Sequence, residues 1–347
     1  MIQRAQNILN RPGFKTFCYT EKQKPGFSLG LQMAEKLAFL DGDMPVNKNA
    51  LVVPFDQQFF ETLTFEFYEW LDAIYPTNPL TDTVKENFNN YLTYTFTPKY
   101  PGEQPRPGCG STVHPNGTVD RSIFIDPTND IRTYKSGPHE AGHSLSKTFT
   151  LLNRRQHEDC GEVAPVIIDK LFMIFLKEKH PDLYNQVAAD LEIADRNLMV
   201  IKARECLLDA SILKVACGEQ TMNDVIKNYG KYFTQGMINS TFTKIENYKF
   251  MPMYENRYML QSMLAYKMVE RFEADRYTTV KQLKHILQND DHYSFQDVLD
   301  YLNMPTKQQL IDDYIASHTA FAASVKTNVA TTQQGLTTQN NTGKQQP

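Results

Sequence analysis

The chain has 347 residues, of which 41% are hydrophobic and 22% are charged, and its net charge is −4. This length and composition suffice for one large core or two adjoining lobes, and they exclude a wholly disordered chain. Lys and Arg are scattered and no apolar run reaches 18 residues, so we expect neither nucleic-acid binding nor a membrane span.

The cysteines and the first residues of the chain indicate a compartment. The five cysteines are widely spaced and form no C-x-x-C pair, which favours a reducing environment. Residues 1–5 lack the apolar core of a signal peptide. We therefore expect a soluble protein of the cytoplasm or another reducing compartment, or one delivered into another cell by a route that needs no signal peptide.

The first part of the sequence predicts an N-terminal helical lobe over residues 1–104. Apolar residues spaced three and four apart predict helices over 27–40, 55–75 and 81–96. The last two are rich in Phe and Tyr, which at helical spacing more often form a core than line a binding cleft. Four prolines between residues 99 and 115 then predict a loop at the lobe boundary.

A short strand and a metal-binding pattern follow. Residues 122–125 read Ser-Ile-Phe-Ile, whose β-branched and aromatic content predicts a strand. His139, Glu140 and His143 then form the pattern H-E-x-x-H. On a helix both imidazoles can reach one metal ion while the glutamate reaches the water that the metal carries, as in zinc peptidases. Pro138, directly before the first histidine, must begin or kink this helix.

A second predicted helix carries two candidate carboxylates, Glu162 and Asp169. They are seven residues apart, which is two helical turns, so they share one face of the helix. A catalytic zinc site needs a third protein ligand and an open position for water. One carboxylate could be that ligand while the other orients a ligating imidazole.

These segments resemble the thimet oligopeptidase and oligopeptidase F family of zinc metallopeptidases. The active-site helix of that family reads H-E-x-G-H, which residues 139–143 match with Gly142 in the fourth position. Residues 162–164, Glu-Val-Ala, are similar to the start of its second motif. Residues 108–110, Gly-Cys-Gly, and the strand that follows resemble the loop and strand edge that hold the substrate backbone in that family.

The resemblance implies a fold and a ligand set. The fold would be mainly α and zincin-like, with a small β-sheet edge beside the active-site helix and helical lobes around a cleft. The metal would be Zn²⁺, held by His139, His143 and Asp169, although Asp169 is one methylene shorter than the family's glutamate. Glu162 remains the alternative ligand, or else a hydrogen-bond partner of a ligating imidazole.

Two tyrosines further along also match the family. Tyr254 and Tyr258 lie one turn apart on a predicted helix, where the family has tyrosines that line its cleft. The resemblance implies that they donate hydrogen bonds to the negative tetrahedral intermediate of peptide hydrolysis.

The remainder of the chain is predicted to be helical to residue 325, which completes a catalytic region over residues 105–325. The predicted helices span 181–199, 200–217, 222–233, 254–274, 279–288, 294–302 and 307–325. Residues 326–347 are rich in Thr, Gln and Asn and nearly free of large apolar groups, so we expect a disordered polar tail.

Together these features predict a zinc-dependent metalloendopeptidase that hydrolyses internal bonds of peptides or of unstructured protein segments. Glu140 would act as the general base that takes a proton from the attacking water. Two other hypotheses stay open. A catalytically inactive peptidase-like binding protein would keep the fold without tight zinc binding, and a helical scaffold would leave His139 and His143 merely solvated.

Overall fold

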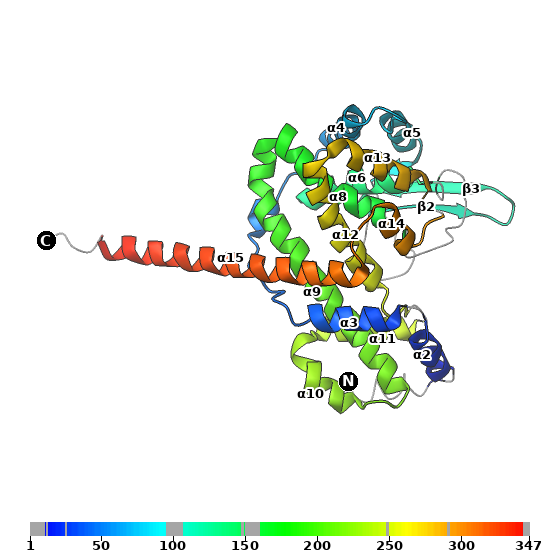
Figure 1. Ribbon diagram of the computed structural model, residues 1–347, viewed down its shortest axis with the longest axis vertical. Helices are drawn as coiled ribbons and strands as arrows, with labels where there is room; N and C mark the ends of the chain where they lie inside the picture. Colours follow the sequence, from blue (N-terminus) through cyan, green and yellow to red (C-terminus); the bar gives the residue numbers. More distant parts are fainter. Residues whose placement is uncertain are drawn as a thin grey trace. The chain divides into compact units, whose positions relative to one another are not determined.

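The computed structural model describes residues 11, 13–24, 26–94, 107–146, 149, 160–247, 250–289 and 292–342. Among these residues the protein is mainly helical and has one three-stranded sheet (Figure 1). The sheet packs beside the helix that carries the H-E-x-x-H pattern. The predicted fold class, mainly α with a small sheet next to this helix, is therefore confirmed.

The chain divides into two compact units. Unit 1 comprises Met1–Pro45, Ile193–Met259 and Ile311–Pro347, and unit 2 comprises Val46–Glu192 and Leu260–Leu310. Unit 2 thus includes residues from both sides of the predicted lobe boundary between residues 104 and 105.

Unit 2 holds the predicted metal-binding residues. Its elements are η1 (Lys48–Leu51), α4 (Gln57–Ile74), α5 (Thr81–Tyr91), β1 (Leu92–Thr93), β2 (Gly108–Val113), β3 (Val119–Phe124), α6 (Ile131–Ser144), α8 (Val163–Lys179), the start of α9 (Pro181–Ala216), most of α12 (Glu255–Ala274), α13 (Arg276–Asn289), α14 (Phe295–Tyr301) and the start of α15 (Lys307–Thr342). Asp56 caps α4 by accepting the backbone N–H of Phe59 at 2.7 Å, which satisfies one of the free N–H groups at the helix start.

The sheet has the strand order β1-β3-β2, with β3 parallel to β1 and antiparallel to β2. Ile123 of β3 lies opposite Leu92 on one side and Cys109 on the other, and it is fully buried. The predicted strand at 122–125 therefore overlaps β3. Strand β1 was not expected, because the predicted helix over 81–96 ends at Tyr91 and the backbone becomes extended at Leu92.

Aromatic side chains form the core that fixes α4 against α8. Phe67 of α4 packs edge-on against Phe172 and Phe175 of α8, with ring centroids 5.8 and 5.7 Å apart. Trp70 of α4 contacts Phe272 of α12 at 5.4 Å. Edge-on packing suits the charge distribution of aromatic rings. The aromatic residues predicted over 55–75 thus serve mainly as core.

A buried ion pair links α4 to α13 in unit 2. The side chain of Lys284 is 2% exposed, and its ammonium lies 2.6 Å from the carboxylate of Asp72. Asp72 also accepts the backbone N–H groups of Leu80 and Thr81 and the hydroxyl of Thr81. Lys284 donates to the carbonyl of Tyr75 as well, at 2.7 Å. Both charges are therefore compensated by hydrogen bonds, as burial requires.

Unit 1 is built from helices. Its elements are α2 (Phe14–Lys22), α3 (Phe27–Leu37), most of α9, α10 (Met222–Tyr229), η3 (Gly230–Tyr232), α11 (Gln235–Glu246), the start of α12 and most of α15. Asp209 of α9 is an unusual core group, because it accepts the backbone N–H of Met253 at 3.1 Å and burial raises its pKa to about 7. Met253 has a φ of +62°, a left-handed conformation that is costly for a residue other than glycine.

Several helices differ from the sequence expectations. Helix α9 runs without a break through the predicted boundary at 199/200, where no Gly or Pro stops it, and α2 and α11 were not predicted. The backbone of α15 is helical to Thr342. Lys326, the first residue of the predicted tail, pairs with Asp41 at 2.8 Å. Disorder of residues 326–347 stays a prediction that rests on their composition.

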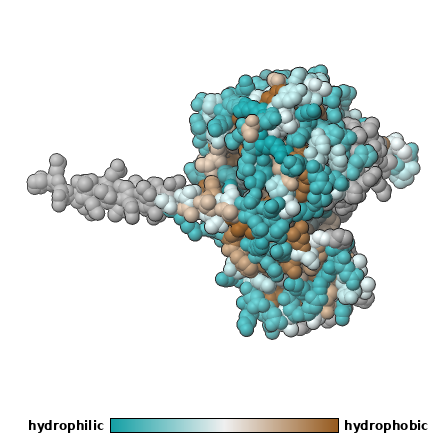
Figure 2. All heavy atoms as spheres, in the orientation of Figure 1, coloured by the Kyte–Doolittle hydropathy of each residue, from teal (hydrophilic) through white to brown (hydrophobic). Residues whose placement is uncertain are grey.

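The face of the molecule in Figure 2 is mostly hydrophilic, with hydrophobic residues scattered over it. Within the part of the chain that the structure describes, no helix combines the length and the apolar character needed to cross a lipid bilayer.

Candidate metal centre

Helix α6 presents the H-E-x-x-H residues. It begins after Asp130, whose carboxylate accepts the N–H of Arg132 at 2.8 Å. Pro138 lies inside the helix and removes one N–H donor from it. The hydroxyl of Tyr68 on α4 donates a hydrogen bond of 2.8 Å to the carbonyl of Pro138, so α4 holds the backbone directly before His139.

Two glycines allow α6 to approach its neighbours closely. A Cβ atom at Gly137 would come within 2.8 Å of the Phe60 ring on α4 and closer still to the hydroxyl of Thr64. A Cβ atom at Gly142 would lie 2.7 Å from Cδ1 of Ile168 on α8. Since real Cβ atoms do not approach other atoms so closely, a Cβ at Gly137 would have to displace Thr64 or the Phe60 ring, whereas at Gly142 only the flexible end of Ile168 would have to move.

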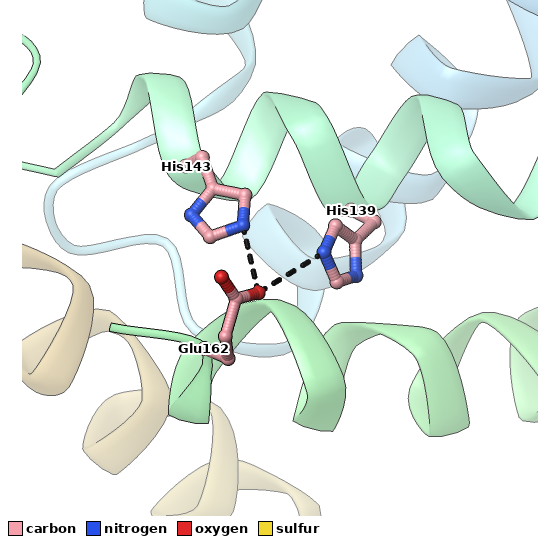
Figure 3. Close-up of side chains that lie close together, drawn as sticks. All are labelled: His139, His143 and Glu162. Atoms are coloured by element: carbon pink, nitrogen blue, oxygen red, sulfur yellow. Dashed lines mark hydrogen bonds and ion pairs between the residues drawn. The ribbon is translucent and has the colours of Figure 1, made fainter. Parts of the chain in front are cut away.

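The two histidines meet the carboxylate of Glu162. Glu162 directly precedes α8, and its Oε2 lies 3.0 Å from Nε2 of His143 and 3.4 Å from Nε2 of His139. Figure 3 shows the carboxylate between the two imidazoles, reaching from α8 toward α6. One donor atom from each of the three residues lies within 4.8 Å of the others. This is a set of two imidazoles and one carboxylate that could hold a metal ion.

Asp169 lies on the other side of His139. Its Oδ2 is 3.3 Å from Nδ1 of His139, the ring nitrogen that does not face Glu162. An imidazole that binds a metal through one nitrogen commonly donates its other N–H to a carboxylate. The arrangement therefore favours Glu162 as the third metal ligand and Asp169 as the partner of His139, which reverses the roles that the family resemblance implies.

Glu140 is the residue that fits a metal-carried water. It is 4% exposed, and its Oε2 has no hydrogen-bond partner among the described residues. Burial raises the pKa of Glu140, and the adjacent His139 and His143 offset part of that rise. An unpartnered buried carboxylate oxygen is costly. A water molecule held at the neighbouring donor set would satisfy it, so the residues present fit a catalytic zinc site.

The charges at the site are strongly coupled. Burial would raise the pKa of Glu162, but the neighbouring imidazoles of His143 and His139 hold it far below its usual value. Burial would also lower the pKa of His139, but the charge and hydrogen bond of Asp169, with a hydrogen bond to Glu162, raise it well above its usual value. The lowered pKa keeps Glu162 ionised, whereas the raised pKa of His139 favours a protonated ring, so a metal ion would have to displace that proton to bind.

Comparisons with known proteins support the fold. No protein-family profile and no curated protein matches this sequence. Among solved structures, a Bacillus anthracis protein assigned as an oligoendopeptidase F matches with a TM-score of 0.50 and 14% sequence identity. The match covers 79% of this chain and 47% of the other, so the chain spans about half the length of that structure.

The chain has an oligoendopeptidase-like fold. At 14% identity the likeness concerns the fold alone, and the roles of individual residues rest on the geometry of this site.

Tyr254 and Tyr258 belong to unit 1, whereas the histidines belong to unit 2. Their hydroxyls lie 3.4 Å apart, Arg257 stacks over the ring of Tyr254 at 3.8 Å, and the ammonium of Lys202 lies 4.4 Å from the ring centre of Tyr258. Their catalytic role stays a prediction.

Sequence reasoning missed Tyr68, because nothing local links it to a carbonyl 70 residues away.

Proposed function

We propose that this protein is a zinc metalloendopeptidase that hydrolyses internal bonds of peptides or unstructured protein segments. The observation that carries the proposal is the donor set of His139, His143 and Glu162 beside a buried Glu140 with an unpartnered oxygen. Three protein ligands with one open position are typical of catalytic rather than structural zinc. The oligoendopeptidase-like fold supports the same reaction class.

In the proposed mechanism each residue has a defined task. His139, His143 and Glu162 hold the metal, and Asp169 keeps the imidazole of His139 oriented. Bound zinc supplies a Lewis acid that polarises the scissile carbonyl and acidifies a water molecule. Glu140 takes a proton from the attacking water and later delivers it to the leaving amine.

Tyr254 and Tyr258 complete the proposal. On the basis of the family resemblance, their hydroxyls donate hydrogen bonds to the oxygen that becomes negative during the reaction. Replacing either with Phe should lower kcat while zinc retention stays unchanged, because neither residue is assigned as a ligand.

The first test is metal analysis of protein purified without chelators, followed by a peptide-cleavage assay. We expect one zinc per chain and cleavage of unstructured peptides. Protein with zinc but without cleavage would support the inactive binding protein, and protein without zinc would support the helical scaffold. Glu140→Gln should keep zinc and lower turnover by at least about 100-fold, the scale of general acid–base loss. Glu66→Gln, a carboxylate paired with His180, serves as the control.

A second test assigns the third ligand. Glu162→Ala should be purified free of zinc, whereas Asp169→Ala should bind zinc about 10–100-fold more weakly than the native protein, which is the usual cost of losing a partner of a ligating histidine. Zinc titration of both variants against a chelating dye measures this. The ligand assignment is wrong if Asp169→Ala is metal-free while Glu162→Ala binds zinc tightly.

A further inference from the structure

Lys135 continues the chain of contacts that begins at the metal ligands. It lies on α6 one turn before His139, and its ammonium is 3.9 Å from Oδ2 of Asp169. The same oxygen lies 3.3 Å from Nδ1 of His139. Both charged side chains are largely buried, at 13% exposure for Lys135 and 17% for Asp169. One carboxylate oxygen on α8 thus faces two groups from successive turns of α6.

The contact between Lys135 and Asp169 balances negative charge at the site. Glu140, Glu162 and Asp169 place three carboxylates around the two histidines. With all three ionised, a divalent metal would leave one negative charge in excess, and Lys135 balances it. An uncompensated charge in a buried site is costly, so a carboxylate without Lys135 would tend to turn toward water.

The direction of that movement decides the consequence for the metal. Asp169 can accept the Nδ1–H of His139 only while its carboxylate stays on the α6 side of α8. That hydrogen bond fixes the tautomer in which Nε2, the nitrogen facing Glu162, carries the free lone pair. The loss of the Lys135 contact would therefore act on Nε2 through Asp169 and the imidazole ring.

We propose that Lys135 is a positioning residue for the metal centre: by holding Asp169 against Nδ1 of His139, it keeps Nε2 of His139 available to the metal. This proposal rests on the proposed zinc function. It extends the set of residues that serve the metal by one step beyond Asp169, to a cation on the same helix as the two histidines.

The test compares Lys135→Met with Lys135→Arg. Methionine keeps the apolar stem and removes the charge, while arginine restores it. We expect Lys135→Met to bind zinc about 10-fold more weakly in chelator competition, at the lower end of the range for groups that orient ligands, and Lys135→Arg to recover most of the loss. The control is Lys85→Met, which removes an exposed ion pair with Glu69 far from α6 in sequence.

A spectroscopic measurement separates positioning from a general loss of structure. In zinc-loaded protein, the Nδ1 proton of His139 should give a slowly exchanging NMR signal that weakens in Lys135→Met and returns in Lys135→Arg. Tighter zinc binding by Lys135→Met would mean that Lys135 only repels the metal, and this would overturn the proposal. Unchanged zinc binding and an unchanged signal would overturn it as well.

A measurement on metal-free protein separates this proposal from the proposed function. In a double-mutant cycle of Lys135→Met and Asp169→Asn, the unfolding equilibrium constants should show a coupling of at least about fivefold, because the two side chains contact each other. If the two variants are coupled but the native protein binds no zinc, the proposed zinc function is wrong and only the contact between Lys135 and Asp169 is supported. If the native protein binds zinc but the variants are not coupled, only the proposed role of Lys135 is wrong.

Discussion

The hydroxyl of Tyr68 donates a hydrogen bond of 2.8 Å to the carbonyl of Pro138, the residue directly before His139. Tyr68 is fully buried, and burial, with the nearby charge of Asp169, raises its pKa well above the usual value, so the hydroxyl keeps its proton. An interior proline weakens a helix by removing one of its hydrogen bonds. Tyr68 therefore ties the backbone of α6 to α4 at the proline, although the carbonyl that loses its helical partner there is that of Tyr134.

Tyr68→Phe should accordingly destabilise the protein and loosen the metal centre. The loss of one buried hydrogen bond costs about 1–2 kcal/mol, measurable as a lower midpoint in urea unfolding. Zinc affinity should fall in parallel, because the backbone before His139 loses its anchor. Tyr19→Phe, at an exposed position, should change neither quantity. If Tyr68→Phe matched the native protein in both, the hydrogen bond would have no role in holding α6.

A side chain at position 142 should clash with Ile168, and shortening Ile168 should relieve the clash. Gly142→Ala should cost on the order of 1 kcal/mol or less, because the new Cβ would press only against Cδ1 of Ile168, the flexible end of that side chain. Ile168→Val removes that Cδ1 atom and alone should cost about 1 kcal/mol. The double variant should be more stable than the sum of the two losses. Gly110→Ala, where a Cβ meets open space, is the control.

The stability of the protein should depend on keeping both charges of the buried pair of Asp72 and Lys284. Lys284→Met should destabilise the protein by about 3–5 kcal/mol, because it leaves a buried carboxylate without its partner. Adding Asp72→Asn should recover part of this loss. Thermal unfolding of the three variants at pH 7 measures both effects, and equal melting temperatures for the single and double variants would contradict the explanation.

The same pair also makes the stability of the protein depend on pH in the acid range. Burial would raise the pKa of Asp72, but hydrogen bonds from Lys284 and Thr81 outweigh it and hold the pKa below its usual value. A carboxyl with a depressed pKa stabilises the folded state above its unfolded pKa of about 4 and loses that contribution as the pH falls further. Stability should therefore fall less steeply below about pH 4 in Asp72→Asn than in the native protein.

Titration of Asp209 should make the stability of the protein fall, rather than rise, as the pH increases toward neutral. Its pKa is raised to about 7 by burial, so the folded state holds a proton that the unfolded chain releases near pH 4. Its contribution to stability is full below about pH 4 and is lost as the pH rises through about 7. Asp209→Asn should therefore lose less stability than the native protein between pH 5 and pH 8, which urea unfolding at several pH values would measure. Parallel curves would show that Asp209 does not titrate in this range.

The spacing of residues predicts part of the metal centre and leaves part undetermined. A spacing of four residues, close to one helical turn, places His139 and His143 on one face, and their ring centroids lie 5.0 Å apart in the structure. The same reasoning cannot separate Glu162 from Asp169, since the sequence puts both on one face of a single predicted helix. The choice depends on which ring nitrogen each carboxylate meets, and this follows from side-chain rotamers and from how closely Gly142 allows the helices to pack.

Local pattern also fails where a helix carries little apolar surface. Helix α11 buries only Thr241, Phe242 and Ile245, so its apolar period is weak, yet Thr234 caps it by accepting the N–H of Met237. The cap residue was the available signal. The contact between Tyr68 and Pro138 spans 70 residues and has no local signal at all.

The closeness of the metal donors along the chain has a consequence for the order of folding. His143 and Glu162 are 19 residues apart, and α6 and α8 are neighbouring elements of unit 2 among the described residues. Closing so short a loop costs little chain entropy, and contacts of low sequence separation generally form early. We expect the pairing of α6 with α8 to be among the first tertiary contacts of the folding chain, so that the donor set is assembled before the long-range contacts between α4 and α13.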